Sequence, residues 1–160
     1  MKSSLAIAAV IAVLVAAPLA FSRPAASDHR PPSVFYGHIK SMKATKSGYE
    51  IRFDPAWWLT GRAAEQAKFE DTGSRDVPND YYIVDEGHRL LTFPVGKQAE
   101  VTMVGNNVRT IRLSAAELNQ LENGKNPRHR HLMEPGAGFW IQIGEKYPNR
   151  AVKLIQQYQP

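Results

Sequence analysis

The sequence contains no cysteine among its 160 residues. This absence excludes disulfide bonds, thiol catalysis and a lipid anchor attached through cysteine. Stability must therefore come from a hydrophobic core. A chain of this length can supply one, since a domain of comparable size buries roughly two-thirds of the surface that its unfolded chain exposes.

Sequence signatures of catalysis are also missing. The chain has no Gly-x-Ser-x-Gly elbow, no Ser-x-x-Lys, no His-Glu-x-x-His and no glycine-rich phosphate or dinucleotide loop. Carboxylates are present, but no spacing singles out a general acid and base pair. The pattern favours a protein that is not an enzyme and uses no cofactor.

One long stretch lacks polar side chains altogether. "LAIAAVIAVLVAAPLAF" runs from Leu5 to Phe21 and follows a start whose single charge is Lys2. A short basic start, an apolar segment and small residues around Ser22 are typical of a secretory signal peptide. We predict a signal peptide over residues 1–22 and a product that is secreted or held in the cell envelope. An uncleaved membrane anchor is the alternative, because the stretch is close to the minimum of about 17 residues for a spanning helix.

The formal net charge of +5 at pH 7 is modest, and Lys2 would leave with the signal peptide. No Asn-x-Ser/Thr sequon occurs, which favours a bacterial exported protein. Outside the cell, nucleic acid is not an expected partner. A cell-envelope polymer or another exported protein is expected instead, with membrane contact only through an uncleaved N-terminal segment. The sequence does not indicate an oligomeric state.

Residues 23–33, "RPAASDHRPPS", have the composition of a flexible spacer, and residues 34–160 are predicted to form a single domain. The domain begins with a β-hairpin that turns at "ATKSG", in which Tyr49, Ile51 and Phe53 share one face. Further strands are predicted within 81–104, divided by Gly87 and by Pro94–Lys97, and then at 108–113, 139–143 and 151–158.

Two helices interrupt these strands. Asp54-Pro55 is a good helix opening, a second start follows at Thr60, and Gly73 is placed to end the helix. Ser114 and Glu117 have capping-box spacing and predict a helix to about residue 122. The fold class is therefore mainly β (α+β). We expect a small, mostly antiparallel barrel or curled sheet, OB-like or SH3-like, with two short helices. An α+β sandwich is the alternative.

The adjacent Trp57 and Trp58 are the first candidate ligand-binding residues. They cannot point the same way, so one ring is expected to pack and the other to be available for stacking on a sugar or another flat ligand. A polar and aromatic rim could complete the surface. Its other members are Asn79, Asp80, Tyr81, Tyr82, His88 and Arg89. The competing interpretation of 78–82 is a rigid loop that sets strand register.

A second candidate lies in the loop "PRHRHLMEP". His129, His131 and Glu134 could ligate a metal that assists hydrolysis. The interleaved Arg128 and Arg130 would repel a cation, however, and a solvated basic loop with no metal is the favoured interpretation. An anion-binding loop is a further alternative. A third possibility is a structural or inhibitor-type interaction protein that contacts an acidic partner through residues 125–131.

Several blocks together resemble small exported bacterial proteins of actinobacterial type. The resemblance covers residues 37–160 and implies export. No block is a catalytic signature, so the resemblance assigns no residue a role. The matching blocks are "GHI" at 37–39, "FDPAWWLTG" at 53–61, "EDTG" at 70–73, "PNDYY" at 78–82, "HRLLT" at 88–92, "NPRH" at 126–129, "GFWI" at 138–141 and "QQY" at 156–158. We therefore expect an exported, non-enzymatic binding module that acts at the cell envelope or outside it.

Overall fold

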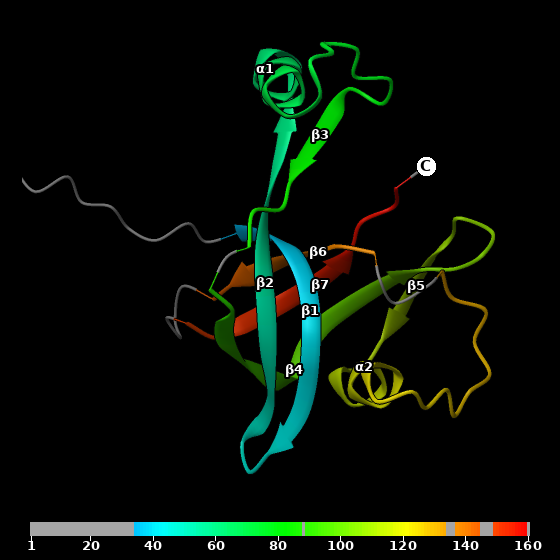
Figure 1. Cartoon of the computed structure of the whole chain (residues 1–160). Coiled ribbons are helices and arrows are strands. Elements are labelled where there is room, and N and C mark those ends of the chain that lie inside the picture. Colours follow the sequence, from blue (N-terminus) through cyan, green and yellow to red (C-terminus); the bar gives the residue numbers. More distant parts are fainter. Residues whose placement is uncertain (1–33, 88, 134–136, 145–148, 160) are drawn as a thin grey trace, which may run out of the picture. The chain divides into compact units, whose positions relative to one another are not determined.

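The computed structural model describes residues 34–87, 89–133, 137–144 and 149–159, so the predicted signal peptide and spacer lie outside the described part. Seven strands and two helices follow one another along the chain (Figure 1). In order they are β1 (Val34–Thr45), β2 (Gly48–Thr60), α1 (Gly61–Thr72), β3 (Tyr81–Val84), β4 (Leu91–Val104), β5 (Thr110–Leu113), α2 (Ala115–Glu122), β6 (Phe139–Ile143) and β7 (Ala151–Gln156).

Five of the strands close into a barrel. β1 pairs with β2, β2 with β4, β6 with β7 and β1 with β6, all antiparallel. The barrel is completed by a parallel contact between β4 and β7. The first three barrel strands follow one another in sequence, a helix comes next, and a hairpin forms the last two barrel strands. The third and fifth barrel strands are parallel, and this is the connectivity of an OB-type barrel. The prediction of a mainly β, OB-like barrel with two helices is confirmed.

The barrel interior holds the hydrophobic core. Ile51 and Phe53 of β2 point inward together with Ile141 of β6 and Leu154 of β7, and all four are fully buried. Tyr49 packs against the same core, so the predicted inner face of the first hairpin is correct. Gly37 of β1 lets the first two strands approach closely, because a Cβ there would lie 2.0 Å from the Asp54 carbonyl oxygen.

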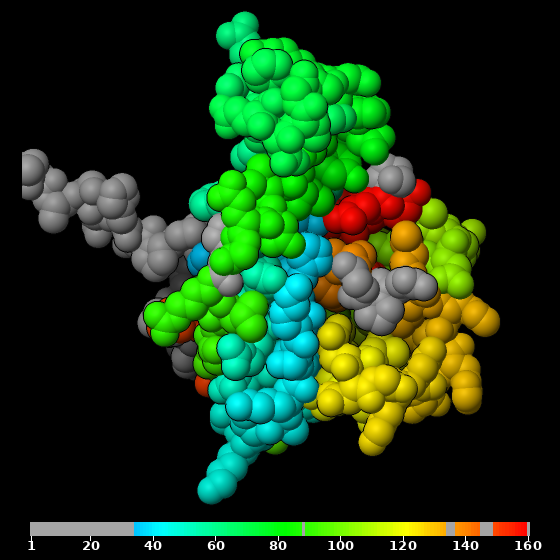
Figure 2. Space-filling model, viewed as in Figure 1, coloured from blue at the N-terminus to red at the C-terminus, as the bar shows by residue number. Residues whose placement is uncertain are grey.

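β2 does not stop where the barrel ends. Its last pair with β4 is Phe53 with Leu91, and beyond Ala56 it pairs with β3 instead. We call residues 57–84, which contain this two-stranded ribbon and α1, the arm. Figure 1 shows α1 and the ribbon extending beyond the barrel. Figure 2 shows the arm, in green, as a lobe of its own.

Two sequence predictions about strand boundaries are wrong. Asp54 and Pro55 do not open a helix but continue β2, and the Asp54 carboxylate forms an ion pair with Lys40 at 3.0 Å. Proline is tolerated here because this part of β2 lies between its pairings with β4 and β3, where one edge lacks a ladder partner. The helix begins at the second predicted start and ends at Gly73, which has φ 75°.

Residues 94–97 also fail to divide a strand, because β4 continues through them. Instead, the register of β4 against β7 shifts between Val95 and Glu100. Pro94 is exposed on the strand and faces Glu50 of β2. The turn residues thus produce an irregularity within one long strand rather than two short strands.

The capping of α2 is only half as predicted. The Ser114 side chain accepts a hydrogen bond from the Glu117 amide, as an N-cap should. The carboxylate of Glu117 does not reach back to Ser114 but accepts a hydrogen bond from Nε of Arg130 at 2.5 Å. Glu117 is buried, and its hydrogen bond with Arg130 ties the loop that follows α2 to the helix. Neither helix of the described chain is long and apolar enough to span a bilayer.

Candidate functional site: the aromatic faces of the arm

Strand geometry separates the two adjacent tryptophans. Successive side chains of a strand point to opposite faces of the sheet, and both residues lie in β2. Trp57 is 63% exposed, whereas Trp58 is half-buried. The structure therefore identifies Trp57 as the ring that is available to a ligand and Trp58 as the ring that packs.

Trp58 belongs to an aromatic cluster that joins the arm to the outside of the barrel. Its ring stacks on Tyr81 of β3 with a centroid distance of 4.0 Å, and it meets Tyr36 of β1 edge-on at 5.0 Å. Trp140 of β6 lies 6.0 Å from Trp58 and 4.9 Å from Tyr36. Each such pair contributes about 0.5–1.5 kcal/mol beyond the burial of area. The cluster thus fixes the arm through contacts with two barrel strands.

The C-terminal residues close one side of this cluster. Gln157 accepts a hydrogen bond from the Trp140 indole at 2.9 Å, and Gln159 donates one to the Tyr36 hydroxyl at 2.6 Å. Burial raises the pKa of the Tyr36 phenol, and the hydrogen bond from Gln159 partly offsets this rise. Gly138 is required beside the phenol, because a Cβ there would lie 2.2 Å from its oxygen.

A histidine and a carboxylate lie near the other side of the cluster. His38 Nδ1 is 3.8 Å from Asp85 Oδ2, and the Tyr36 and His38 rings are 6.2 Å apart. The nitrogen is buried and has no hydrogen-bond partner within the described residues. This pair links β1 to the segment that leaves the arm, which supports a structural role for the surroundings of Trp58.

The opposite face of the ribbon carries Trp57. Tyr82 points to this face and donates a hydrogen bond from its hydroxyl to Asp71 of α1, and this hydrogen bond raises the pKa of the phenol. The two predicted tyrosines therefore do face opposite ways, as Tyr81 stacks on Trp58. Trp57 makes no ring contact with another aromatic residue in the described part of the chain, and 63% of its surface is exposed.

The remaining predicted rim residues are dispersed. Asn79 and Asp80 are exposed in the turn before β3, where Asp80 has φ 56°. Arg89 is exposed on the segment between β3 and β4, and His88 lies outside the described residues. The structure thus brings Trp58 and Tyr81 together and places Trp57 and Tyr82 on the other face, while Asn79 and Asp80 lie in the exposed turn that leads into Tyr81.

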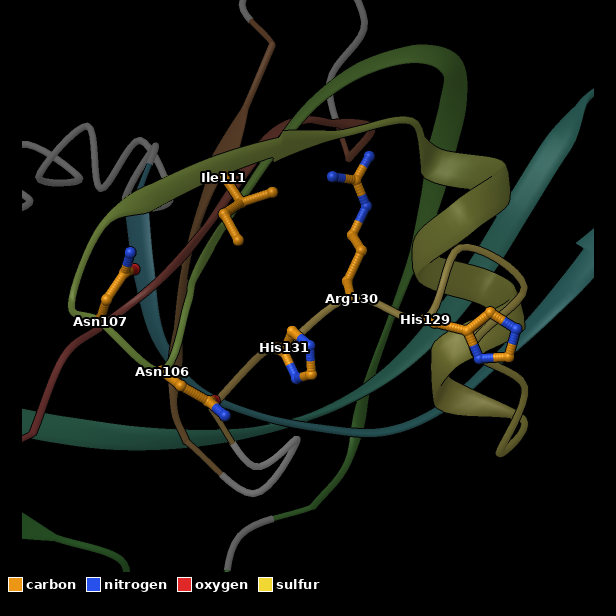
Figure 3. Close-up of a pocket in the computed structure, with 6 residues that line it drawn as sticks. All are labelled: Asn106, Asn107, Ile111, His129, Arg130 and His131. Atoms are coloured by element: carbon orange, nitrogen blue, oxygen red, sulfur yellow. The ribbon is translucent and has the colours of Figure 1, made fainter.

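The histidine loop does not gather metal ligands. His129 has φ 48°, so the loop is not the extended segment that would put both imidazoles on one side. Figure 3 shows the side chain of His129 directed away from the other lining side chains, including His131. In the described residues no group of three histidine or carboxylate side chains could hold a metal. Glu134 lies outside those residues.

Sequence reasoning missed Tyr36 and Trp140, which complete the aromatic cluster. Each stands beside an inward-facing aromatic residue, and the alternation within "VFYG" and "GFWI" places it on the outer face of its strand. Their meeting depends on the register of β1 against β6, in which Tyr36 opposes Trp140. No local pattern predicts that pairing between segments about a hundred residues apart.

No family model, curated protein or solved structure matches the chain. The protein is an OB-type barrel in which an arm with aromatic faces is inserted between the second and third barrel strands.

Proposed function

We propose that this protein is an exported, non-enzymatic binding module that acts at the cell envelope or outside the cell. Its ligand is a sugar-containing polymer that stacks on the indole of Trp57. The single observation that carries this proposal is the 63% exposure of that indole on a paired strand. The predicted export rests on the apolar N-terminal stretch from Leu5 to Phe21.

Trp57 is held in place before a ligand binds, which supports its proposed role in stacking. Indole offers a large apolar surface with few rotatable bonds, so stacking on it costs little conformational entropy. β2 holds the residue in a ladder in which Trp57 opposes Val84 of β3. A flat ligand would therefore meet a ring whose backbone is already fixed, which favours binding.

The architecture is consistent with this role. OB barrels use their outer faces and connecting loops to bind oligosaccharides and oligonucleotides. The arm occupies the connection between the second and third barrel strands, and connections carried by a rigid scaffold often hold binding residues. The analogy concerns the fold alone, and the choice of a sugar polymer comes from the predicted export and the exposed indole.

The proposal is tested with a glycan array and with sedimentation of insoluble envelope material. Trp57→Ala is expected to weaken binding at least about tenfold, because a stacked aromatic anchor contributes on the order of 1.4 kcal/mol or more. The matched control is Phe69→Ala, which removes another exposed aromatic ring, 43% exposed on α1. Phe69 lies under the guanidinium of Arg75 and belongs to α1, whereas Trp57 belongs to β2.

The control variant is expected to bind as the unmodified protein does. Equal loss of binding in both variants would show that the effect is not specific to the Trp57 face. Failure of the unmodified protein to bind any glycan or envelope fraction would refute the proposed function.

A further inference from the structure

A second surface feature lies at the other end of the β4 strand. A cavity of about 360 Å³ opens between the turn joining β4 to β5 and the loop that follows α2. Figure 3 shows its lining side chains. They are Asn106, Asn107, Ile111, His129, Arg130 and His131.

Arg130 is held in this cavity by a buried partner. Its Nε and Nη2 donate to the two carboxylate oxygens of Glu117, at 2.5 and 3.4 Å. This bidentate contact raises the pKa of Arg130, so the guanidinium stays charged. Glu117 is only 7% exposed and Arg130 24% exposed, so the carboxylate is the buried member of the pair. A guanidinium has further N–H groups on Nη1 and Nη2, and the contact with Glu117 does not use them.

Hydrogen bonds also fix the backbone of the loop that follows α2. Asn126 accepts from the Arg130 amide at 2.9 Å and donates to the Arg130 carbonyl at 2.8 Å. The Asn106 amide donates to the His131 carbonyl at 3.0 Å, which joins the loop to the β4–β5 turn. The Met133 amide donates to the Val104 carbonyl at 2.9 Å. The two walls of the cavity are therefore one hydrogen-bonded unit.

Each wall also contains a residue in an unfavourable backbone conformation. Val108 has φ 60° and His129 has φ 48°. A β-branched residue in the left-handed region is a genuine outlier, and such strain concentrates at binding and catalytic sites. Val108 occupies this position in the turn whose Asn107 Oδ1 accepts a hydrogen bond from the Arg109 amide at 3.2 Å.

The side chains that line the cavity are mainly hydrogen-bond donors. The Oδ1 of Asn107 is bound to the turn, and its NH₂ group can donate. Asn106 and His131 add an amide and an imidazole, and Arg130 adds a guanidinium. Ile111 supplies one apolar wall, and none of the described residues that line the cavity carries a carboxylate. Donors around a fixed guanidinium are the chemistry that recognises an oxyanion.

We propose that this cavity binds an oxyanionic group, a phosphate or a carboxylate, carried on a soluble molecule or on a polymer. The site is independent of the Trp57 face and does not need the proposed sugar binding to hold. Arg130 is the anchoring cation, Glu117 positions it, and the amide of Asn107 supplies a neutral donor.

Titration followed by amide NMR shifts tests the site with two probes, inorganic phosphate and glucuronate, at constant ionic strength. Saturable shifts confined to residues 105–113 and 126–132 are expected. Phosphate and glucuronate distinguish the two sources of the oxyanion, and glucose serves as the uncharged probe. A saturating response to glucose at these residues would overturn the proposal, as would the absence of saturable shifts with both anions.

The decisive variant is Asn107→Asp. It keeps the oxygen that accepts from the Arg109 amide, so the turn is retained, but it replaces the donor with a negative charge. Binding of the responding anion should weaken at least about tenfold. Asn79→Asp makes the same chemical change in the exposed turn of the arm and should leave binding unaltered. Equal weakening by both substitutions would mean that net charge, not the cavity, governs binding.

Discussion

At the scale of single residues, Glu122 is the side chain whose environment conflicts most with its charge. It is the last residue of α2 and partly buried, and desolvation raises the pKa of its carboxyl from 4.5 to about 7. The folded protein then holds a proton that the unfolded chain has released over this range. Stability contributed by this group must therefore fall as pH rises from 4.5 through 7.

Glu122→Gln removes the charge while keeping the shape of the side chain. We expect the variant to match the unmodified protein at pH 4 and to exceed it by about 1–3 kcal/mol at pH 8, where the native carboxyl is ionised. Partial exposure places the gain below the full conversion of the pKa shift. Urea unfolding at the two pH values measures the difference. Glu65→Gln on the exposed side of α1 is the control, and an identical gain for Glu122→Gln at both pH values would contradict the argument.

At the scale of elements, the arm depends on the ring cluster that joins it to the barrel. Trp58 contacts Tyr81 within the arm, and Tyr36 and Trp140 on the barrel. Trp58→Ala removes all three contacts and is expected to cost about 2–4 kcal/mol of stability, somewhat below the range for a fully buried tryptophan.

The loss should be concentrated in the arm. Amide hydrogen exchange in β3 and α1 is expected to accelerate more than exchange in the closed barrel, because the remaining arm–barrel contacts are few. Trp57→Ala provides the comparison on the same strand, and its effect on stability should be small. A loss of stability with Trp57→Ala as large as with Trp58→Ala would contradict this assignment of the two rings.

The elements themselves were largely predictable from local patterns. Alternation at Tyr49, Ile51 and Phe53 predicted a strand, and the spacing of Ser114 and Glu117 predicted the start of a helix. The helix predicted at Asp54-Pro55 does not form, because the preference of these residues for a helix start is a weak local effect. The pairing of β2 with β1 extends over the same residues. Tertiary pairing outweighed the local helix signal.

At the scale of the whole molecule, the proposed export gives a direct prediction. The protein is expected to accumulate outside the cytoplasm as a chain that lacks residues 1–22, because the apolar stretch ends in small residues suited to cleavage. Intact-mass measurement of the extracellular product checks the cleavage position. A version without residues 1–22 should remain in the cytosol, and intact protein that retains Met1 in the cytosolic fraction would contradict the prediction.

The candidate surfaces of the whole molecule were only partly predictable. The sequence directed attention to the tryptophan pair and the histidine loop. It gave metal ligation only as an alternative to a solvated basic loop, and the structure shows Arg130 of this loop bound to Glu117. The cavity that residues 106–111 share with residues 129–131 was not predictable from the sequence. Its walls come from segments separated by about twenty residues and by a helix.

The amino-acid sequence by itself determined the positions of most strands, the start of the second helix and the absence of disulfides, because turn chemistry, alternation and composition act over a few residues. Only the tertiary structure decided which tryptophan is exposed, that Tyr36 meets Trp140, and that Arg130 is bound to Glu117. These outcomes depend on strand register and barrel closure. Both are set by the packing of distant segments into one core, which no local pattern encodes.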